Sequence, residues 1–378
     1  MAMTPTHDVA IAGLGAMGSA AAYHLASRGL RVVGFDRYAP PHDLGSSHGD
    51  SRIIRHAYAE GTAYVEIVQR ADELWRELET ESGSSLLLRT GGVMIGARES
   101  NLVAGAIRSA VDHRLEYEIL PADELRRRYP VFRPDESMVG VVDPYAGLLC
   151  PEACVSAHLE LARRHGASLH FDEPVQSWSA NAHGVTVVTP AGRYSVDRLI
   201  LATGAWMPEM LPDAGLPLTV ERQVQFWYLP SANSDDFLPA RCPIYIWSDQ
   251  ADELHYGTPD LGHGVKVARM HGGMTTSPDA IRRGVDGRDE RPVREFLDRY
   301  IPDARGALLS SKVCMFTNTP DEHFLIDFHP DYENVIIASP CSGHGFKFAS
   351  AIGEILADLA TRGESRFDLT MFGLARFS

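Results

Sequence analysis

The chain has 378 residues, of which 44% are hydrophobic and 22% are charged, and its formal net charge is -15. This length exceeds what one hydrophobic core usually serves, so we expect a globular protein of two domains. The acidic balance argues against a nucleic-acid partner, because binding to a phosphate backbone needs a basic face. An anionic small molecule is not excluded, since a local cluster of arginines can override the overall charge.

The five cysteines are scattered along the chain, and their odd number fits reduced thiols better than a disulfide framework. Cys150 and Cys154 form a CxxxC pattern with no second pair, so we predict no metal site. The N-terminus, MAMTPTHD, shows no basic segment followed by an apolar one, and no apolar run has the length of a membrane span. We therefore expect a cytoplasmic protein without a membrane partner.

The first predicted unit is a strand over 8–15, a helix over 16–29 and a second strand over 31–37. Gly13, Gly15 and Gly18 form a G-x-G-x-x-G pattern between strand and helix, which is typical of a backbone that approaches a pyrophosphate. Asp36, at the end of the second strand, is placed to accept hydrogen bonds from a ribose diol. We predict dinucleotide binding here. An ordinary glycine turn is the alternative, and the pattern alone does not separate NAD from FAD.

The rest of the chain alternates between helical and strand-rich segments. A loop over 40–52 precedes an amphipathic helix from about Tyr64 to Glu81. Residues 86–142 mix short strands with a basic helix, and 150–206 repeat a βα pattern. Residues 220–313 are strand-rich, and a strand over 334–340 precedes a helix over 346–363. We predict a discontinuous cofactor domain of 1–82, 143–215 and 321–378, with a substrate domain of 83–142 and 216–320.

Two later segments favour FAD over NAD. The buried strand LILATGAW, ending at Trp206, allows a second backbone approach to the cofactor, although a plain core strand is the alternative. The run SSHGDSRIIRHAYAEG, residues 46–61, carries Arg52 and Arg55, which can hold a carboxylate bidentately. A solvated charged loop is the alternative there, but the interleaved Ile53 and Ile54 indicate partial burial.

A third segment lies near the C-terminus. The run from Gly343 to Lys347 follows a predicted strand and precedes the last helix, where a helix N-terminus can meet a flavin edge or a substrate anion. Cys314 lies just upstream, in KVCMFTNTPDEHFLID, and by itself is read as a buried free thiol.

Together these segments resemble the monomeric sarcosine oxidase and N-methyltryptophan oxidase family of flavoproteins, within the wider D-amino-acid-oxidase-like class. The resemblance runs from GLGAMGSAAAYHLA through SHGDSRIIRHAY, ATGAW and CMFTNTPDEHFLID to SGHGFKFAS. It implies an α/β fold with a Rossmann-like FAD-binding domain of the glutathione-reductase type. It also implies an α+β substrate domain with a large antiparallel sheet, and a monomeric protein.

The resemblance also implies where the cofactor lies. Cys314 is expected to be joined through its sulfur to the flavin 8α-methyl group, and Arg52 to sit at the flavin face. Further residues expected to bind the cofactor, besides the three glycines and Asp36, are Arg37, Ser46, His48, Val175, Gly204, Trp206, Gly343, Gly345, Phe346 and Lys347.

For the substrate, the resemblance places the carboxylate on Arg55 and Lys347, with Glu60 near the entrance. Tyr256, in HYGTP, matches a substrate-side tyrosine. Lys266, in GVKVARMHGG, matches the lysine that assists oxygen activation.

Two positions depart from the sarcosine oxidases. Their active-site histidine falls on Met270, and the next residue is His271, which on a continuous strand would face the opposite way. The tyrosine that follows their flavin-linking Cys-Met is Phe316. Both changes make the pocket less polar, so we expect a substrate bulkier or more apolar than sarcosine.

We therefore expect an FAD-dependent oxidase that converts a secondary amine or N-substituted amino acid into an imine. The imine hydrolyses, and O2 is reduced to H2O2. The alternatives are a dehydrogenase of the same fold that passes electrons to a quinone or carrier protein, a nicotinamide-dependent reductase, and a non-catalytic flavoprotein. The clustered charges of Arg52, Arg55, Lys266 and Lys347 argue against the last.

Overall fold

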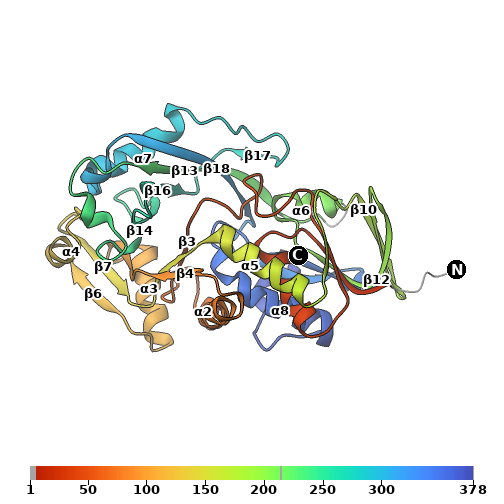
Figure 1. Cartoon of the computed structure of the whole chain (residues 1–378). Helices are drawn as coiled ribbons and strands as arrows, with labels where there is room; N and C mark the ends of the chain where they lie inside the picture. Colours follow the sequence, from red (N-terminus) through yellow and green to blue (C-terminus); the bar gives the residue numbers. More distant parts are fainter. Residues whose placement is uncertain (1–5, 213–214, 378) are drawn as a thin grey trace.

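The computed structural model describes residues 6–212 and 215–377. Residues 1–5, on which part of the signal-peptide prediction rests, lie outside this range. Figure 1 shows two parts side by side, one around β12 and β10 and the other around β6, β7 and β14. Within the described residues, no helix is both long and apolar enough to cross a membrane.

The first part is built on a sheet that has eight strands in the described chain, with the order β10-β11-β12-β1-β2-β9 and with β20 joining β12 to β19. The pairings of β1 with β2 and β12, of β2 with β9, and of β12 with β20 are parallel. The strands are β1 (His7–Ala12), β2 (Val32–Phe35), β9 (Ser168–His170), β10 (Ser177–Asn181), β11 (Gly184–Thr189), β12 (Gly192–Leu201), β19 (Leu325–His329) and β20 (Tyr332–Ser339).

Alternation along β1 explains why both faces of this sheet are covered. Val9 and Ile11 join the core formed with the helices, whereas Ala10 and Ala12 join the core on the other face. Parallel strands buried on both faces are expected to be apolar, as β1 is from Val9 to Ala12. The helices that pack on this sheet are α1 (Ala16–Ser27), α5 (Pro151–Arg164) and α8 (Ala349–Arg362), and α2 (Ala63–Ser82) packs against α5 and α8.

The second part is built on a sheet that has nine strands in the described chain, with the order β17-β13-β16-β15-β14-β5-β7-β6 and with β18 paired to β13. Its pairings are antiparallel except that of β14 with β5. The strands are β5 (Gly92–Ala97), β6 (Glu118–Pro121), β7 (Met138–Asp143), β13 (Thr219–Tyr228), β14 (Ile244–Ser248), β15 (Leu254–Thr258), β16 (Val265–Met270), β17 (Thr275–Thr276) and β18 (Leu308–Asn318).

The predicted fold class is confirmed: a mostly parallel sheet covered by helices, joined to a large antiparallel sheet with its own helices. The domain boundaries themselves stay a prediction.

Two helices were not predicted, and both lie in segments that we expected to be mainly strands. In α3 (Asn101–Asp112), residue 105 is a glycine, which is unfavourable inside a helix. A larger residue does not fit there, because a Cβ would lie 2.6 Å from the carbonyl oxygen of Ala59. In α7 (Gly287–Tyr300), Pro292 and a highly charged sequence hide the helical pattern, although Asp286 and Asp289 form a capping box. The predicted basic helix is present as α4 (Ala122–Arg128).

A small sheet lies between the two large ones, and one of its strands begins at Arg52, the last residue of the predicted loop over 40–52. Its order is β3-β8-β4, with bounds β3 (Arg52–Ile54), β8 (Gly147–Leu149) and β4 (Leu87–Arg89). Pairing of Arg52 with Leu149 anchors the arginine-bearing segment, so the partial burial inferred from the two isoleucines is confirmed. The short helix α6 (Met207–Met210) follows a turn of 3-10 helix at Gly204–Trp206.

Candidate active site

A cavity of about 480 Å³ lies where the carboxyl ends of β1, β2, β12 and β20 face the second sheet. This is where ligands bind in folds with open parallel sheets. The predicted site residues that line it are Gly13, Gly15, Asp36, Arg37, Ser46, Arg52, Arg55, Glu60, Val175, Gly204, Trp206, Tyr256, Lys266, Met270, His271, Cys314, Phe316, Gly343, Gly345, Phe346 and Lys347.

Gly18 and His48 do not line the cavity, and their assignment to the cofactor site stays a prediction. Gly18 allows close packing at the turn, because a Cβ at this position would lie 1.8 Å from the carbonyl oxygen of Gly13. His48 is buried behind the wall, and neither ring nitrogen has a hydrogen-bond partner among the described residues. Burial, together with the charges of Arg52 and Lys312, lowers the pKa of His48 to about 3.

The glycine-rich turn is shaped to receive a pyrophosphate. Gly13 has a φ of +89°, and a Cβ there would lie 2.5 Å from the carbonyl oxygen of Ala202, so only glycine fits. Gly15 caps α1 without a side chain, and the first turn of the helix carries no acidic residue. The positive end of the helix dipole is therefore directed at the cavity wall that Gly15 and Ala16 form.

Asp36 follows β2 at the same edge of the sheet. Its carboxylate accepts hydrogen bonds from the backbone N–H of Leu14 at 2.7 Å and of Tyr38 at 2.9 Å, which fixes the group in place. Each oxygen retains acceptor capacity for a ribose hydroxyl. The glycine turn, the helix N-terminus and this fixed carboxylate together fit the dinucleotide part of FAD.

The outer end of the cavity holds a contact that the sequence did not reveal. Asp279, from the second part of the molecule, accepts hydrogen bonds from Trp206 Nε1 at 2.8 Å and from Arg37 Nη1 at 2.9 Å. The guanidinium carbon of Arg37 lies 5.3 Å from the centroid of the Trp206 ring. The segment between β17 and α7 is thus tied to the cavity mouth.

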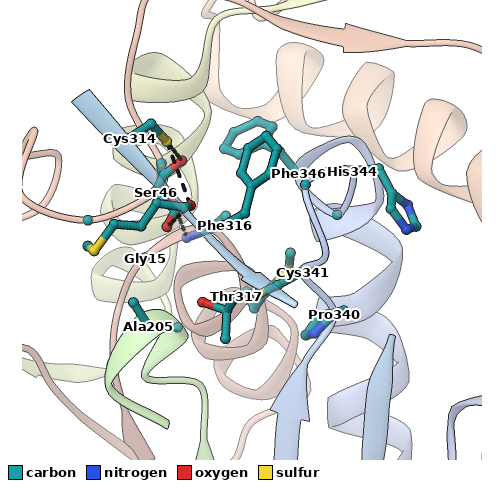
Figure 2. A pocket seen from close by; sticks show the side chains of 18 of the residues that line it. Gly15, Ser46, Ala205, Cys314, Phe316, Thr317, Pro340, Cys341, His344 and Phe346 are labelled. Carbon is teal, nitrogen blue, oxygen red and sulfur yellow. Dashed lines mark hydrogen bonds between the residues drawn. The ribbon is translucent and has the colours of Figure 1, made fainter. Parts of the chain in front are cut away.

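Cys314 lies on β18, paired in register with Gln223 of β13. Its Sγ is 3.7 Å from Arg52 Nη2 and 3.7 Å from the carbonyl oxygen of Ser46, and the residue is buried. Figure 2 shows Cys314 and Phe316 on this strand, facing the loop that carries Cys341 and Phe346. The thiol therefore stands in the cavity wall beside the guanidinium of Arg52.

Lys266 is buried on β16, and its ammonium group is held by backbone carbonyl oxygens. Its Nζ donates to the carbonyl oxygens of Gly49 at 2.7 Å and Ser51 at 2.8 Å, and it lies 5.3 Å from the centroid of the Trp227 ring. Burial and the nearby charge of Arg52 hold the pKa of Lys266 well below its usual value. An exposed lysine on an edge strand, the alternative for this position, is excluded.

Arg55 is 2% exposed and is paired with Glu60. Arg55 Nη2 lies 2.6 Å from both carboxylate oxygens of Glu60, and Nη1 donates to the carbonyl oxygen of Ala57 at 2.8 Å. Although burial opposes ionisation, the charge of Arg55 lowers the pKa of Glu60 to about 2. The guanidinium that was predicted to bind a substrate carboxylate thus already holds a carboxylate of the protein.

Lys347 is also buried and lines the same cavity. Its Nζ donates to the carbonyl oxygen of His344 at 2.7 Å and to the Tyr58 hydroxyl at 3.3 Å. Burial and the neighbouring charge of Arg55 lower the pKa of Lys347 to about 7. Lys347 therefore changes its charge near neutral pH, and an anion bound close by would favour its ammonium form.

Met270 and His271 both line the cavity, which contradicts the expectation that they face opposite ways. Strand β16 ends at Met270, and His271 adopts a left-handed backbone with φ of +63°, so the alternation of a strand no longer applies. His271 Nδ1 lies 3.3 Å from Glu221 Oε2, and its ring packs edge-on against Phe316. Burial opposes protonation, but the hydrogen bond to Glu221 raises the pKa of His271.

The described residues contain no group of three or more His, Cys, Asp or Glu side chains that could hold a metal ion. Tyr58, Glu221 and Asp279 contact residues that line the cavity, and the sequence did not reveal these contacts. Tyr58 lies inside the recognised segment, in RHAYAE, and could have been found there. Glu221 and Asp279 carry no local signal, because their partners are distant in sequence.

The chain matches the family described as FAD dependent oxidoreductase over residues 8–359. It is 43% identical to the monomeric sarcosine oxidase of Streptomyces avermitilis over 380 residues, covering 100% of this chain and 99% of the relative. The chain belongs to this family of FAD-dependent oxidoreductases. This oxidoreductase is also 36% identical to the N-methyl-L-tryptophan oxidase of Salmonella arizonae, covering 98% of this chain and 99% of the relative. The resemblance stated from the sequence is confirmed.

The fold of this FAD-dependent oxidoreductase is also found in a solved structure. NikD, described as an unusual amino acid oxidase essential for nikkomycin biosynthesis, superimposes in its open form with a TM-score of 0.86. The match covers 98% of each chain at 24% identity, so it supports the fold alone.

Proposed function

We propose that this enzyme oxidises the C–N bond of an N-substituted amino acid or other secondary amine to an imine, which then hydrolyses in water. O2 is the electron acceptor and H2O2 the second product. The observation that carries the proposal is that Arg55 and Lys347, two buried cations, line the same cavity as Cys314 and the dinucleotide cradle. Full-length relatives at 43% and 36% identity, a sarcosine oxidase and an N-methyltryptophan oxidase, support this substrate class.

FAD supplies the two-electron oxidation when it is bound. The glycine turn, α1 and Asp36 hold its dinucleotide part, and Cys314 is the residue that would link it covalently. The position of Sγ in the cavity wall, 3.7 Å from Arg52, supports that assignment. Arg52 thus stands beside the linkage and stabilises negative charge there.

The substrate carboxylate binds to Arg55 and Lys347, which fixes the bond to be oxidised relative to the cofactor. Because Glu60 already occupies Arg55, the incoming carboxylate competes with Glu60 for one guanidinium. The amine must be neutral to be oxidised, and the nearby cations favour this by lowering its pKa. In its ammonium form, Lys266, buried on β16, would stabilise the negative charge that develops when O2 is reduced.

The substrate is bulkier or more apolar than sarcosine. Met270 and Phe316 supply an apolar wall where the sarcosine oxidases carry polar side chains, and Leu102 and Ile246 extend the apolar lining. The enzyme works as a monomer in the cytoplasm, in keeping with its free cysteines and with the name of its sarcosine oxidase relatives.

The test is an anaerobic absorbance scan of the purified protein against a panel of N-alkyl and cyclic amino acids. Bleaching of the flavin band by one compound, with recovery and peroxide formation in air, is the expected result. Bleaching that air does not reverse, but an added quinone does, would indicate a dehydrogenase. A flavin band that no amine bleaches would favour a non-catalytic flavoprotein, and absence of flavin after addition of FAD would overturn the proposal.

The covalent link has its own test. The intact mass of the acid-denatured protein is expected to exceed the polypeptide mass by one FAD, and Cys314→Ala is expected to remove that excess. Cys341→Ala is the matched control, because Cys341 also lines the cavity but lies after β20 rather than on β18. Retention of covalent flavin in the Cys314→Ala protein would refute the assignment.

A further inference from the structure

The side chain of Tyr58 contacts both cations proposed to bind the substrate carboxylate. Its ring centroid lies 4.2 Å from the guanidinium carbon of Arg55 and 5.2 Å from Lys347 Nζ. Its hydroxyl lies 3.3 Å from the same Nζ and 2.6 Å from His344 Nδ1. The residue is fully buried and is packed by the rings of Tyr64 and Phe348.

The carbonyl oxygen of Glu322 sets the direction of the hydrogen bonds that join His344, Tyr58 and Lys347. His344 Nε2 lies 3.0 Å from the carbonyl oxygen of Glu322, which can only accept, so Nε2 carries the proton. Burial lowers the pKa of His344 to about 3, so the ring is neutral and Nδ1 is an acceptor. The Tyr58 hydroxyl must therefore donate to Nδ1, which leaves the oxygen lone pairs of Tyr58 for Lys347.

This chain of hydrogen bonds aims the ammonium group of Lys347. An ammonium has three N–H groups. One is accepted by the carbonyl oxygen of His344 at 2.7 Å and one by Tyr58, and among the described residues no third partner of Nζ is found. Since Lys347 lines the cavity, its remaining N–H is the one available to a ligand.

The ring of Tyr58 supports the other cation. Arg55 stacks on its face, while the guanidinium edge is held by Ala57 and Glu60. A cation over an aromatic face is favoured, and more so where water is excluded. The ring of Tyr58 thus fixes the position of Arg55, and its hydroxyl fixes that of Lys347.

We propose that Tyr58 is a positioning residue that aligns Lys347 and Arg55 for the substrate carboxylate. The inference rests on the proposed function, because it assumes that these two cations bind that carboxylate. The hydroxyl does more than orient the lysine. By accepting a hydrogen bond from the ammonium form it favours the protonated state of Lys347, against the burial and the positive charges that lower its pKa.

The charged and titratable groups around Lys347 define what sets its protonation. They are Arg55, Glu60, Arg52, Tyr58 and His344. Arg55 and Arg52 disfavour the ammonium, Glu60 favours it, and His344 is neutral. Loss of the Tyr58 hydroxyl removes one of the few groups that favour the ammonium, so the pH at which Lys347 loses its proton should fall.

The test uses the oxidised holoenzyme with acetate as the carboxylate probe and the perturbation of the flavin absorbance as readout. The dissociation constant of acetate in the wild-type protein is expected to rise as the pH increases through about 7, where Lys347 loses its proton. In Tyr58→Phe, acetate should bind on the order of tenfold more weakly at pH 6.5. In this variant, the pH at which the dissociation constant of acetate begins to rise should be lower than in the wild-type protein.

Tyr64→Phe is the matched control. Tyr64 is a buried tyrosine next to Tyr58, and its hydroxyl lies 3.1 Å from His323 Nδ1 rather than near either cation. This variant should bind acetate within about twofold of the wild-type protein. In a Lys347→Met background, the effect of Tyr58→Phe should largely disappear, because the hydroxyl then has no ammonium to orient.

The outcomes separate the inference from the proposed function. Unchanged acetate affinity and an unchanged pH break in Tyr58→Phe overturn the inference, as does an equal loss of affinity in the Lys347→Met background. A wild-type flavin spectrum that acetate does not perturb at any pH overturns the carboxylate site itself, and the inference with it. Acetamide, which has the same shape without the charge, should bind weakly to all five proteins.

Discussion

Arg55 and Glu60 form an ion pair in which one guanidinium nitrogen, Nη2, lies 2.6 Å from each carboxylate oxygen of Glu60. The arginine is buried, whereas the side chain of Glu60 is 27% exposed. A buried guanidinium needs a carboxylate or equivalent acceptor, and here the protein supplies one from five residues away. A substrate carboxylate and the carboxylate of Glu60 would therefore compete for the guanidinium of Arg55.

Glu60→Gln should bind acetate several-fold more tightly than the wild-type protein, because a neutral amide competes less well for Arg55. The glutamine oxygen can still accept one hydrogen bond, so the arginine is not left without a partner. The measurement is the acetate dissociation constant from the flavin spectrum. Weaker binding would mean that Glu60 helps to shape the carboxylate site rather than competing for it.

The N-terminal unit could be predicted because its chemistry is local. The turn at Gly13, the packing position at Gly18 and the acid at Asp36 lie within about two dozen residues, and each has one physical reason to be there. The arginine-bearing segment was recognisable for a similar reason. Its two charges and the interleaved Ile53 and Ile54 indicate a buried polar segment, and the segment is indeed partly buried on β3.

The rest of the site depends on contacts between distant parts of the chain. Glu221 and His271 are 50 residues apart, and Trp206 and Asp279 are 73 apart, so no spacing pattern links them. Whether Met270 or His271 faces the cavity could not be predicted, because the sequence does not reveal where β16 ends, and a single left-handed residue changes which side chains face the cavity. Likewise, His48 is a residue type that is common in active sites, but it is buried behind the residues that line the cavity.

The pair formed by Glu221 and His271 should stabilise the fold only within a limited pH range. The pKa of His271 is raised, so its contribution is complete below about pH 6.5 and is lost as the pH rises through the folded value. The pKa of Glu221 is lowered despite burial, so its contribution is lost as the pH falls below about 4.5. The Tm difference between wild-type and His271→Gln should therefore be larger at pH 5.5 than at pH 8.5. An equal difference at both values would show that His271 is not protonated in the folded protein.

Asp279 should slow the loss of cofactor, because it ties Arg37 and Trp206 at the outer end of the cavity. In a Cys314→Ala background, where the cofactor is not covalently held, Asp279→Ala should release FAD several-fold faster. The effect is expected to be modest because this ion pair is partly exposed. The release rate can be followed by the rise in free-flavin fluorescence. Glu136→Ala, which breaks a surface ion pair with Arg126, is the control and should leave the rate unchanged.

Met270→His combined with Phe316→Tyr should shift the substrate preference towards sarcosine. The two changes replace apolar cavity walls with polar groups that can hydrogen-bond a small substrate or a bound water. Discrimination between substrates that differ by a few methylene groups is typically worth about tenfold or more in kcat/KM. We therefore expect the ratio of kcat/KM for sarcosine to that for N-methyltryptophan to rise by about tenfold. His271 already packs edge-on against Phe316, so Met270→His would bring a second imidazole close to the same ring. The single variant Phe316→Tyr shows what the added hydroxyl does without that second imidazole. A ratio that does not change in either variant would mean that other walls of the cavity, such as Leu102 and Ile246, set the substrate size.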